Sequence, residues 1–143
     1  MAASFTQKAR GFARELLRRS EELGWGGNAI HSGNVTLGYL ALRRGLVDEA
    51  KEHLLAAVAG NPGSPHLDSF GPDMSLARAL LRRGEREVVL RYLEECGRFW
   101  RMGKRRLAEW KAIIRSGKEP NFGPNLSYWL SSVTDPHPTT KAS

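Results

Sequence analysis

Apolar residues along this 143-residue chain recur at intervals of three and four, and they almost nowhere alternate with polar residues as in a strand. Glycines directly follow most of these periodic stretches, where a helix often ends in a left-handed residue. The pattern therefore predicts an all-α fold. Helices are expected over 6–23, 28–44, 48–59, 72–83, 85–100 and 104–116, with a loop over 61–71 and a short helix near 124–132.

The four central predicted helices form two similar pairs. The turn RRGLVDEA at 43–50 aligns with RRGEREVV at 82–89, which places Gly45 over Gly84 at a shift of 39 residues. The agreement extends outward on both sides, where Leu37, Gly38, Ala41, Ala50, Leu54 and Ala57 correspond to Leu76, Ala77, Leu80, Val89, Leu93 and Cys96. Each copy is expected to be a helical hairpin with small residues where its helices cross closely.

The first copy resembles a tetratricopeptide repeat, on the residues Leu37, Gly38, Ala41, Gly45, Ala50, Leu54, Ala57 and Pro62. The second copy has no terminal proline and follows an insertion around SPHLD. The resemblance implies a short tetratricopeptide-like α-solenoid, with repeats at about 31–64 and 70–101 and capping helices at 4–24 and 104–117. A single domain is expected over 1–132, followed by a flexible tail over 133–143 that is poor in large apolar residues.

The same resemblance implies a binding surface, because the first helix of each tetratricopeptide repeat lines the concave face. The residues expected to contact a partner there are Tyr39, Arg43, Met74, Arg78 and Arg82, alongside Ser32, Val35, Leu42 and Leu81. Arginine pairs bidentately with carboxylates, so the expected function is a non-enzymatic scaffold or adaptor for an acidic or carboxylate-bearing partner segment. Two alternatives stay open: an ordinary solvated helix face, and self-association through Leu42 and Leu81.

The charge distribution suggests a second kind of partner. The net charge is +7, and residues 103–143 carry +4 of it. The segment RFWRMGKRRLAEWK at 98–111 mixes cations with Phe99, Trp100 and Trp110, a composition that can hold phosphates while bases stack. The alternative nucleic-acid-binding residues are Arg98, Arg101, Lys104, Arg105 and Arg106. We favour the interpretation that Trp100 and Trp110 anchor the core, since an apolar stripe is formed by Leu107, Trp110, Ile113 and Ile114.

Motifs that carry catalysis or hold a cofactor are absent from the sequence. The histidines His31, His53, His66 and His137 are scattered, and the single cysteine, Cys96, cannot form an internal disulfide. For His31 we favour a hydrogen-bonded core histidine over a polar site. We therefore expect no enzyme, no metal and no cofactor, a cytoplasmic location, and no membrane partner, because no apolar run reaches the ~18 residues of a spanning helix.

One phrase occurs twice, as SFGPDM at 69–74 and NFGPNL at 121–126, 52 positions apart. In each copy a proline stands before an apolar stretch, where it can occupy the first position of a helix. The phenylalanine of each copy is then expected to pack back on that helix. We interpret the phrase as a structural device rather than a ligand-binding motif.

Overall fold

The computed structural model describes residues 2–23 and 26–126 of the chain, with side chains over 7–19 and 26–126. Within these residues the protein forms seven α-helices and two short 3-10 helices, and it contains no strand, so the all-α prediction is confirmed. In chain order they are α1 (Ala2–Leu23), α2 (Gly27–Arg43), α3 (Val47–Ala56), α4 (Pro65–Phe70), α5 (Ser75–Arg82), α6 (Arg86–Cys96), η1 (Arg101–Gly103), α7 (Lys104–Arg115) and η2 (Gly123–Asn125).

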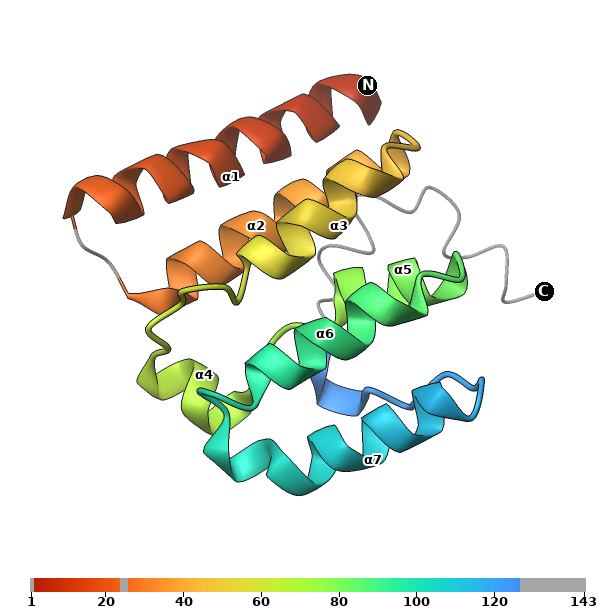
Figure 1. The fold of residues 1–143 in the computed structure, drawn as a ribbon. Helices are drawn as coiled ribbons and strands as arrows, with labels where there is room; N and C mark the ends of the chain where they lie inside the picture. The colour runs from red at the N-terminus through yellow and green to blue at the C-terminus, as the bar shows by residue number, and fades with distance from the viewer. Residues whose placement is uncertain (1, 24–25, 127–143) are drawn as a thin grey trace.

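The helices follow one another in a stack (Figure 1). The hairpin of α2 and α3 packs against the hairpin of α5 and α6, and α1 and α7 lie at the two ends of the stack. In the view of Figure 1, α3 and α6 lie in front of α2 and α5. The chain thus forms two layers, one containing α2 and α5 and the other containing α3 and α6.

Small residues allow the helices of the core to approach closely. Ala50, Ala57 and Ala77 are fully buried among larger side chains such as Leu54 and Leu80. Gly38 lies at one such close approach, because a Cβ atom on it would be 2.4 Å from Leu76 Cδ2 and 3.0 Å from His53 Cβ. The expected close crossings therefore bring α2, α3 and α5 together at Gly38.

Glycines end both hairpin helices as the sequence predicts. Gly45 and Gly84 follow α2 and α5 with φ of +81° and +85°, a conformation that residues with a Cβ rarely adopt. The amides of Leu46 and Glu85, one residue further on, donate to Ala41 O and Leu80 O. The two hairpins thus use the same turn geometry.

The expected loop over 61–71 is wrong in part, since it contains α4. Ser64 caps this helix by accepting a hydrogen bond from Leu67 N at 3.0 Å, and Pro65 stands in the first turn. Only Leu67 is buried in α4, so these six residues carry too little apolar periodicity to be recognised as a helix from the sequence.

The prediction that Pro72 begins a helix is also wrong. The first turn of α5 starts at Ser75, because the backbone just before it is engaged in tertiary hydrogen bonds. Asp73 N donates to His31 Nε2 at 2.9 Å, and Tyr92 Oη donates to Asp73 O at 2.8 Å. In the second copy Pro124 does stand in the first turn of a short 3-10 helix, η2. Of the helix expected near 124–132, residues 127–132 lie outside the described residues.

The two copies of the repeated phrase contact each other. Asn125 Nδ2 donates to Phe70 O and to Pro72 O, both at 2.9 Å, and Asn125 O accepts from Met74 N at 2.6 Å. The two phenylalanines differ, since Phe122 is buried against Trp110 whereas Phe70 is 68% exposed. The two copies of the phrase therefore join two distant segments. Phe122 packs on Trp110 of α7, whereas the prediction placed it on the helix that follows it.

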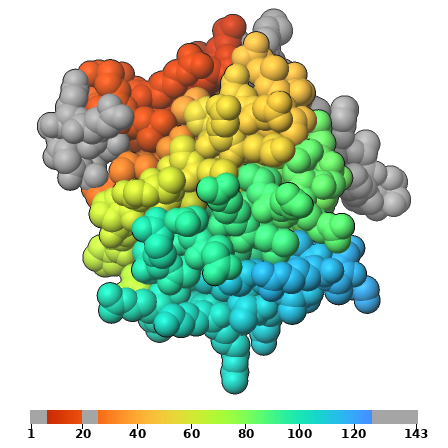
Figure 2. All heavy atoms as spheres, in the orientation of Figure 1, coloured from red at the N-terminus to blue at the C-terminus, as the bar shows by residue number. Residues whose placement is uncertain are grey.

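The layer of α3 and α6 is joined across its surface by ion pairs. Lys51 Nζ on α3 lies 3.1 Å from Glu85 Oε1, just before α6, and Lys111 Nζ on α7 lies 3.0 Å from Glu94 Oε1 on α6. Side chains of α3, α6 and α7 cover this face (Figure 2). In the described part of the chain, no helix has both the length and the apolar character required to cross a bilayer.

Candidate functional site

Four of the five expected partner-binding residues form what we call the α2–α5 face: Tyr39, Arg43, Arg78 and Arg82. Each pair lies four residues apart on its own helix and therefore shares one side of that helix. Arg43 and Arg82 are exposed, while Tyr39 and Arg78 are half-buried. The fifth residue is a correction: Met74 is completely buried and contributes to the core, not to the surface.

Several apolar residues that the sequence places on the same face also belong to the core. Val35 is 1% exposed and Leu42 is 5% exposed, so neither offers a contact surface. Leu81 is half-buried. The face is accordingly more polar than expected, and Leu42 offers no exposed surface for self-association.

A carboxylate already occupies the α2–α5 face. Arg82 Nε lies 2.9 Å from Glu119 Oε1, and its terminal nitrogen lies 3.0 Å from Glu119 Oε2, which is a two-bond pairing of guanidinium and carboxylate. The pairing holds the pKa of Glu119 below its usual value and, together with a smaller effect of Tyr39, raises the pKa of Arg82. Arg78 also lowers the pKa of Glu119, so both α5 arginines act on this carboxylate.

The role of Glu119 on this face is not predicted from the sequence. Glu119 lies 37 positions from Arg82, in the segment after α7, and no local spacing connects the two residues. The only available signal was an acidic residue within the most basic third of the chain.

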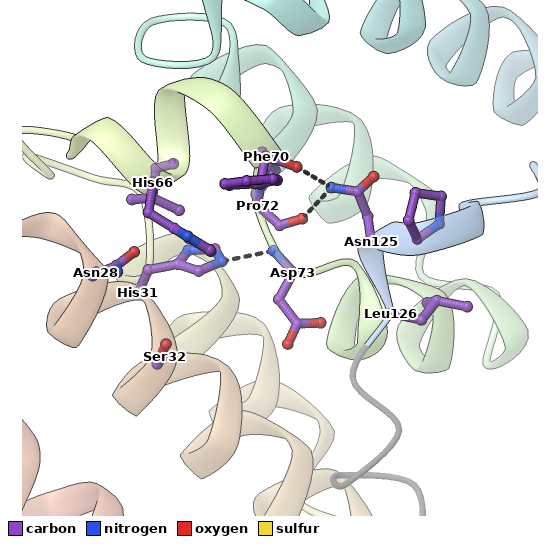
Figure 3. Close-up of a pocket in the computed structure, with 12 residues that line it drawn as sticks. Asn28, His31, Ser32, His66, Phe70, Pro72, Asp73, Asn125 and Leu126 are labelled. Atoms are coloured by element: carbon purple, nitrogen blue, oxygen red, sulfur yellow. Dashed lines mark hydrogen bonds between the residues drawn. The ribbon is translucent and has the colours of Figure 1, made fainter.

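Beside the first turn of α2 lies a cavity of about 360 Å³, which we call the His31 cavity. It opens between α2, α4, the loop at 71–74 and η2 (Figure 3). Its lining residues are Asn28, His31, Ser32, His66, Leu67, Phe70, Gly71, Pro72, Asp73, Pro124, Asn125 and Leu126. The cavity thus forms where the two copies of the repeated phrase meet.

His31 is a structural part of this cavity. It is 3% exposed, its Nε2 accepts from Asp73 N, and its Nδ1 lies 3.4 Å from Ala57 O. These partners require the neutral ring with its proton on Nδ1. Burial lowers the pKa of His31, and the nearby Asp73 opposes this effect. The interpretation of His31 as a hydrogen-bonded core histidine is confirmed.

The rest of the cavity wall is polar, with one exposed aromatic ring. Asp73 is the single charged residue among the lining residues, apart from the histidines. Its Oδ1 accepts from Ser75 N at 2.8 Å, which orients the carboxylate. The ring of Phe70 lies 4.9 Å from the ring of His66, centroid to centroid. Such a wall can hold a ligand through charge, hydrogen bonds and an aromatic surface together.

The aromatic side chains of the basic segment at 98–111 pack into the core and are not exposed to a ligand. Phe99, Trp100 and Trp110 are 8%, 3% and 3% exposed, so the interpretation of the two tryptophans as core anchors is confirmed. Arg98 donates to Val58 O at 3.0 Å and pairs with Glu95, and Arg106 lies over the ring of Trp100. The remaining cations of the set, Arg101, Lys104 and Arg105, are exposed.

Metal-binding geometry is not found in the described part of the chain, where no three His, Cys, Asp or Glu side chains are grouped to hold an ion. Cys96 is buried, and burial raises the pKa of its thiol far above the usual range. A buried thiol of this kind is a poor nucleophile.

Comparisons of the chain with known protein families, with curated proteins and with solved structures give no match.

Proposed function

We propose that this protein is a non-enzymatic interaction scaffold of the tetratricopeptide-like class, located in the cytoplasm, that binds an acidic or carboxylate-bearing segment of a partner protein on the α2–α5 face. Two hairpins in series, with α1 and α7 at the ends of the stack, support this assignment. Arg43, Arg78, Arg82 and the half-buried Tyr39 supply the cations and the hydroxyl for such a partner.

The pairing of Arg82 with Glu119 is the observation that carries the proposal. It supplies an internal example of a carboxylate held by two bonds on the proposed binding face. The Arg82 side chain is 59% exposed and that of Glu119 is 37% exposed, so water reaches the pair. A surface ion pair of this kind contributes ~0–1 kcal/mol, and a partner carboxylate can replace Glu119 at a correspondingly small cost.

The test uses a fluorescently labelled tetraglutamate peptide as probe, with tetraglutamine as the uncharged control, and fluorescence anisotropy as the measurement. Arg78→Glu combined with Arg82→Glu should abolish tetraglutamate binding, because both changes place a negative charge beside the ligand. Glu119→Gln should strengthen binding roughly two- to five-fold, since it removes the internal competitor, whose pairing is worth up to ~1 kcal/mol.

Arg105→Glu is the matched control, because Arg105 is an exposed cation on α7, away from the α2–α5 face. If this variant loses as much affinity as the double variant, the probe is responding to overall charge and the assignment to the α2–α5 face fails. If the double variant binds tetraglutamate with unchanged affinity, the assignment to the α2–α5 face also fails.

Nucleic-acid binding is the second candidate, and the exposed cations Arg101, Lys104 and Arg105 favour it. Burial of Phe99, Trp100 and Trp110 removes base stacking, so only phosphate contacts support this function. A single-stranded oligonucleotide would then bind with a steep dependence on salt, and Arg105→Glu would weaken it.

A further inference from the structure

We propose that the His31 cavity is a binding subsite for a cationic side chain, a lysine ammonium or an arginine guanidinium. The subsite goes beyond the proposed function, because it involves neither Arg82 nor any other cation of the α2–α5 face. It is a negatively charged hollow in a protein whose net charge is +7.

Charge is the first argument. Among the described residues that line the cavity, Asp73 carries the one full charge, and none is a lysine or an arginine. In Figure 3 the Asp73 side chain points away from His31, into the space between Ser32 and Leu126. The positive end of α2 opposes a cation with about half an elementary charge, which is smaller than the charge of the carboxylate.

The aromatic ring at the rim is the second argument. Phe70 is 68% exposed, although an aromatic ring of this size normally packs in the core. It lines the cavity together with Asp73, and it is supported on one side by His66. The cavity therefore offers a cation two kinds of partner, the carboxylate of Asp73 and, on another part of its wall, the face of a phenyl ring.

Uncharged acceptors complete the site. Ser32 is exposed on α2 and lines the cavity, as does Asn28, whose Oδ1 accepts from Ser64 Oγ at 3.3 Å and keeps a second lone pair. An ammonium group has three N–H donors and a guanidinium group has five, so either can use these oxygens in addition to Asp73.

The distance along α2 between the cavity and the α2–α5 face predicts how far apart two charged groups of one partner segment must be. This part of the inference rests on the proposed function. Ser32, Tyr39 and Arg43 share one side of α2, because separations of 7 and 11 residues correspond to nearly whole turns. Eleven residues of helix span about 16 Å, which an extended peptide covers with about five residues. One partner segment could then place a cation in the cavity and a carboxylate about five residues away on the α2–α5 face.

The experiment titrates the isotope-labelled full chain with Nα-acetyl-lysine N-methylamide and follows amide chemical shifts. Saturable shifts are expected at Ser32, Phe70 and Asp73, and the norleucine analogue, which lacks the charge, should leave them unchanged. Asp73→Asn should weaken lysine binding by tenfold or more, while its side-chain oxygen can still accept from Ser75 N. Equal shifts with norleucine, preferred binding of the acetyl-glutamate analogue, or no saturable shifts at all would overturn the proposal.

A second pair of variants keeps the test independent of folding. Phe70→Ala should weaken lysine binding roughly two- to five-fold. Phe12→Ala on α1, where the ring is equally 68% exposed, should not change it. The variant Arg82→Glu should lose tetraglutamate and keep the lysine probe, so failure of the cavity and failure of the α2–α5 face give different results. Lysine binding that is unaffected by both Asp73→Asn and Phe70→Ala would contradict the subsite.

Discussion

At the scale of single residues, His31 links three parts of the fold that are distant in sequence. Its ring joins α2 to the end of α3 through Ala57 O and to the loop before α5 through Asp73 N. Tyr92 of α6 stacks beside it, with ring centroids 6.4 Å apart, and donates to Asp73 O. The acceptor role of Nε2 requires the ring to be neutral, so protonation would break the bond from Asp73 N, while Nδ1 donates to Ala57 O in either state.

This geometry predicts that acid destabilises the protein through His31. Burial lowers the pKa of the folded ring below its ordinary value of 6.5, so the unfolded chain binds a proton that the folded chain does not. The contribution to stability is present above about pH 6.5 and is lost as the pH falls toward the folded pKa, at up to ~1.4 kcal/mol per pH unit.

Urea unfolding at pH 7.5 and pH 5.5 measures the effect. His31→Gln should be less stable at pH 7.5 but should lose less further stability on acidification. His53 is the control, because its pKa is also lowered by burial but its side chain is only half-buried, so His53→Gln should flatten the pH dependence less. A slope that His31→Gln leaves unchanged would contradict the role of this ring.

Residue-level properties were only partly accessible to sequence reasoning. The core roles of Trp100 and Trp110 follow from the apolar stripe of their segment, and that of His31 from the general tendency of core histidines to be hydrogen-bonded. Burial confirms all three. The predicted environments of Met74 and Phe70 are wrong, because both residues lie in the stretch before α5, whose conformation is set by tertiary hydrogen bonds and not by local propensity. Local patterns contain no information about such bonds.

At the scale of helices, close packing at glycine positions determines how the two hairpins fit together. The hairpins themselves could be predicted, since their periodicity and the turns at Gly45 and Gly84 are local features. Helix α4 could not, because a six-residue helix with one buried side chain is defined by its cap more than by its pattern.

Gly38→Ala and Gly11→Ala should therefore have opposite effects on stability. An added methyl group at Gly38 meets Leu76 Cδ2, His53 Cβ and Ala50 O, and overpacking of this kind costs ~1–3 kcal/mol. At Gly11, inside α1, no atom lies within 4 Å of the added methyl group, and alanine should stabilise the helix by up to ~1 kcal/mol. Thermal unfolding of the two variants checks both signs, and a stabilising Gly38→Ala would refute the close crossing.

At the scale of the whole molecule, the stacked arrangement makes the local stability of a helix depend on its place in the stack. The helices α2, α3, α5 and α6 each contact neighbours within and between hairpins, whereas the main contacts of α1 are with α2 alone. In repeat-like folds with contacts only between neighbours, terminal elements open more readily than central ones.

Native-state hydrogen exchange should accordingly show a gradient along the stack. Amides of α5 and α6 should exchange at rates that approach those set by global unfolding, and amides of α1 should exchange faster through local opening. Mass spectrometry of peptide fragments resolves the two regions. Equal protection of α1 and α6 would mean that the molecule unfolds as a single cooperative unit.

Long-range pairings are the part of the molecule that sequence reasoning could not supply. The contact of Arg82 with Glu119 and the meeting of the two repeated phrases connect residues 37 to 55 positions apart. Neither pairing follows from periodicity, and together they shape both candidate binding regions. The sequence therefore predicts the all-α fold, the two hairpins and most of the cations of the α2–α5 face, but neither the Glu119 carboxylate on that face nor the cavity.

The two hydrogen bonds that Asn125 donates to Phe70 O and Pro72 O have a consequence for biosynthesis. Phe70 leaves the ribosome 55 residues before Asn125, an interval of about 3 to 11 s at ordinary rates of translation. Throughout that interval the carbonyl groups of Phe70 and Pro72 lack the amide that later satisfies them. The corner of the molecule that holds the cavity is thus completed last, so a nascent chain can contain both hairpins before it contains a finished pocket.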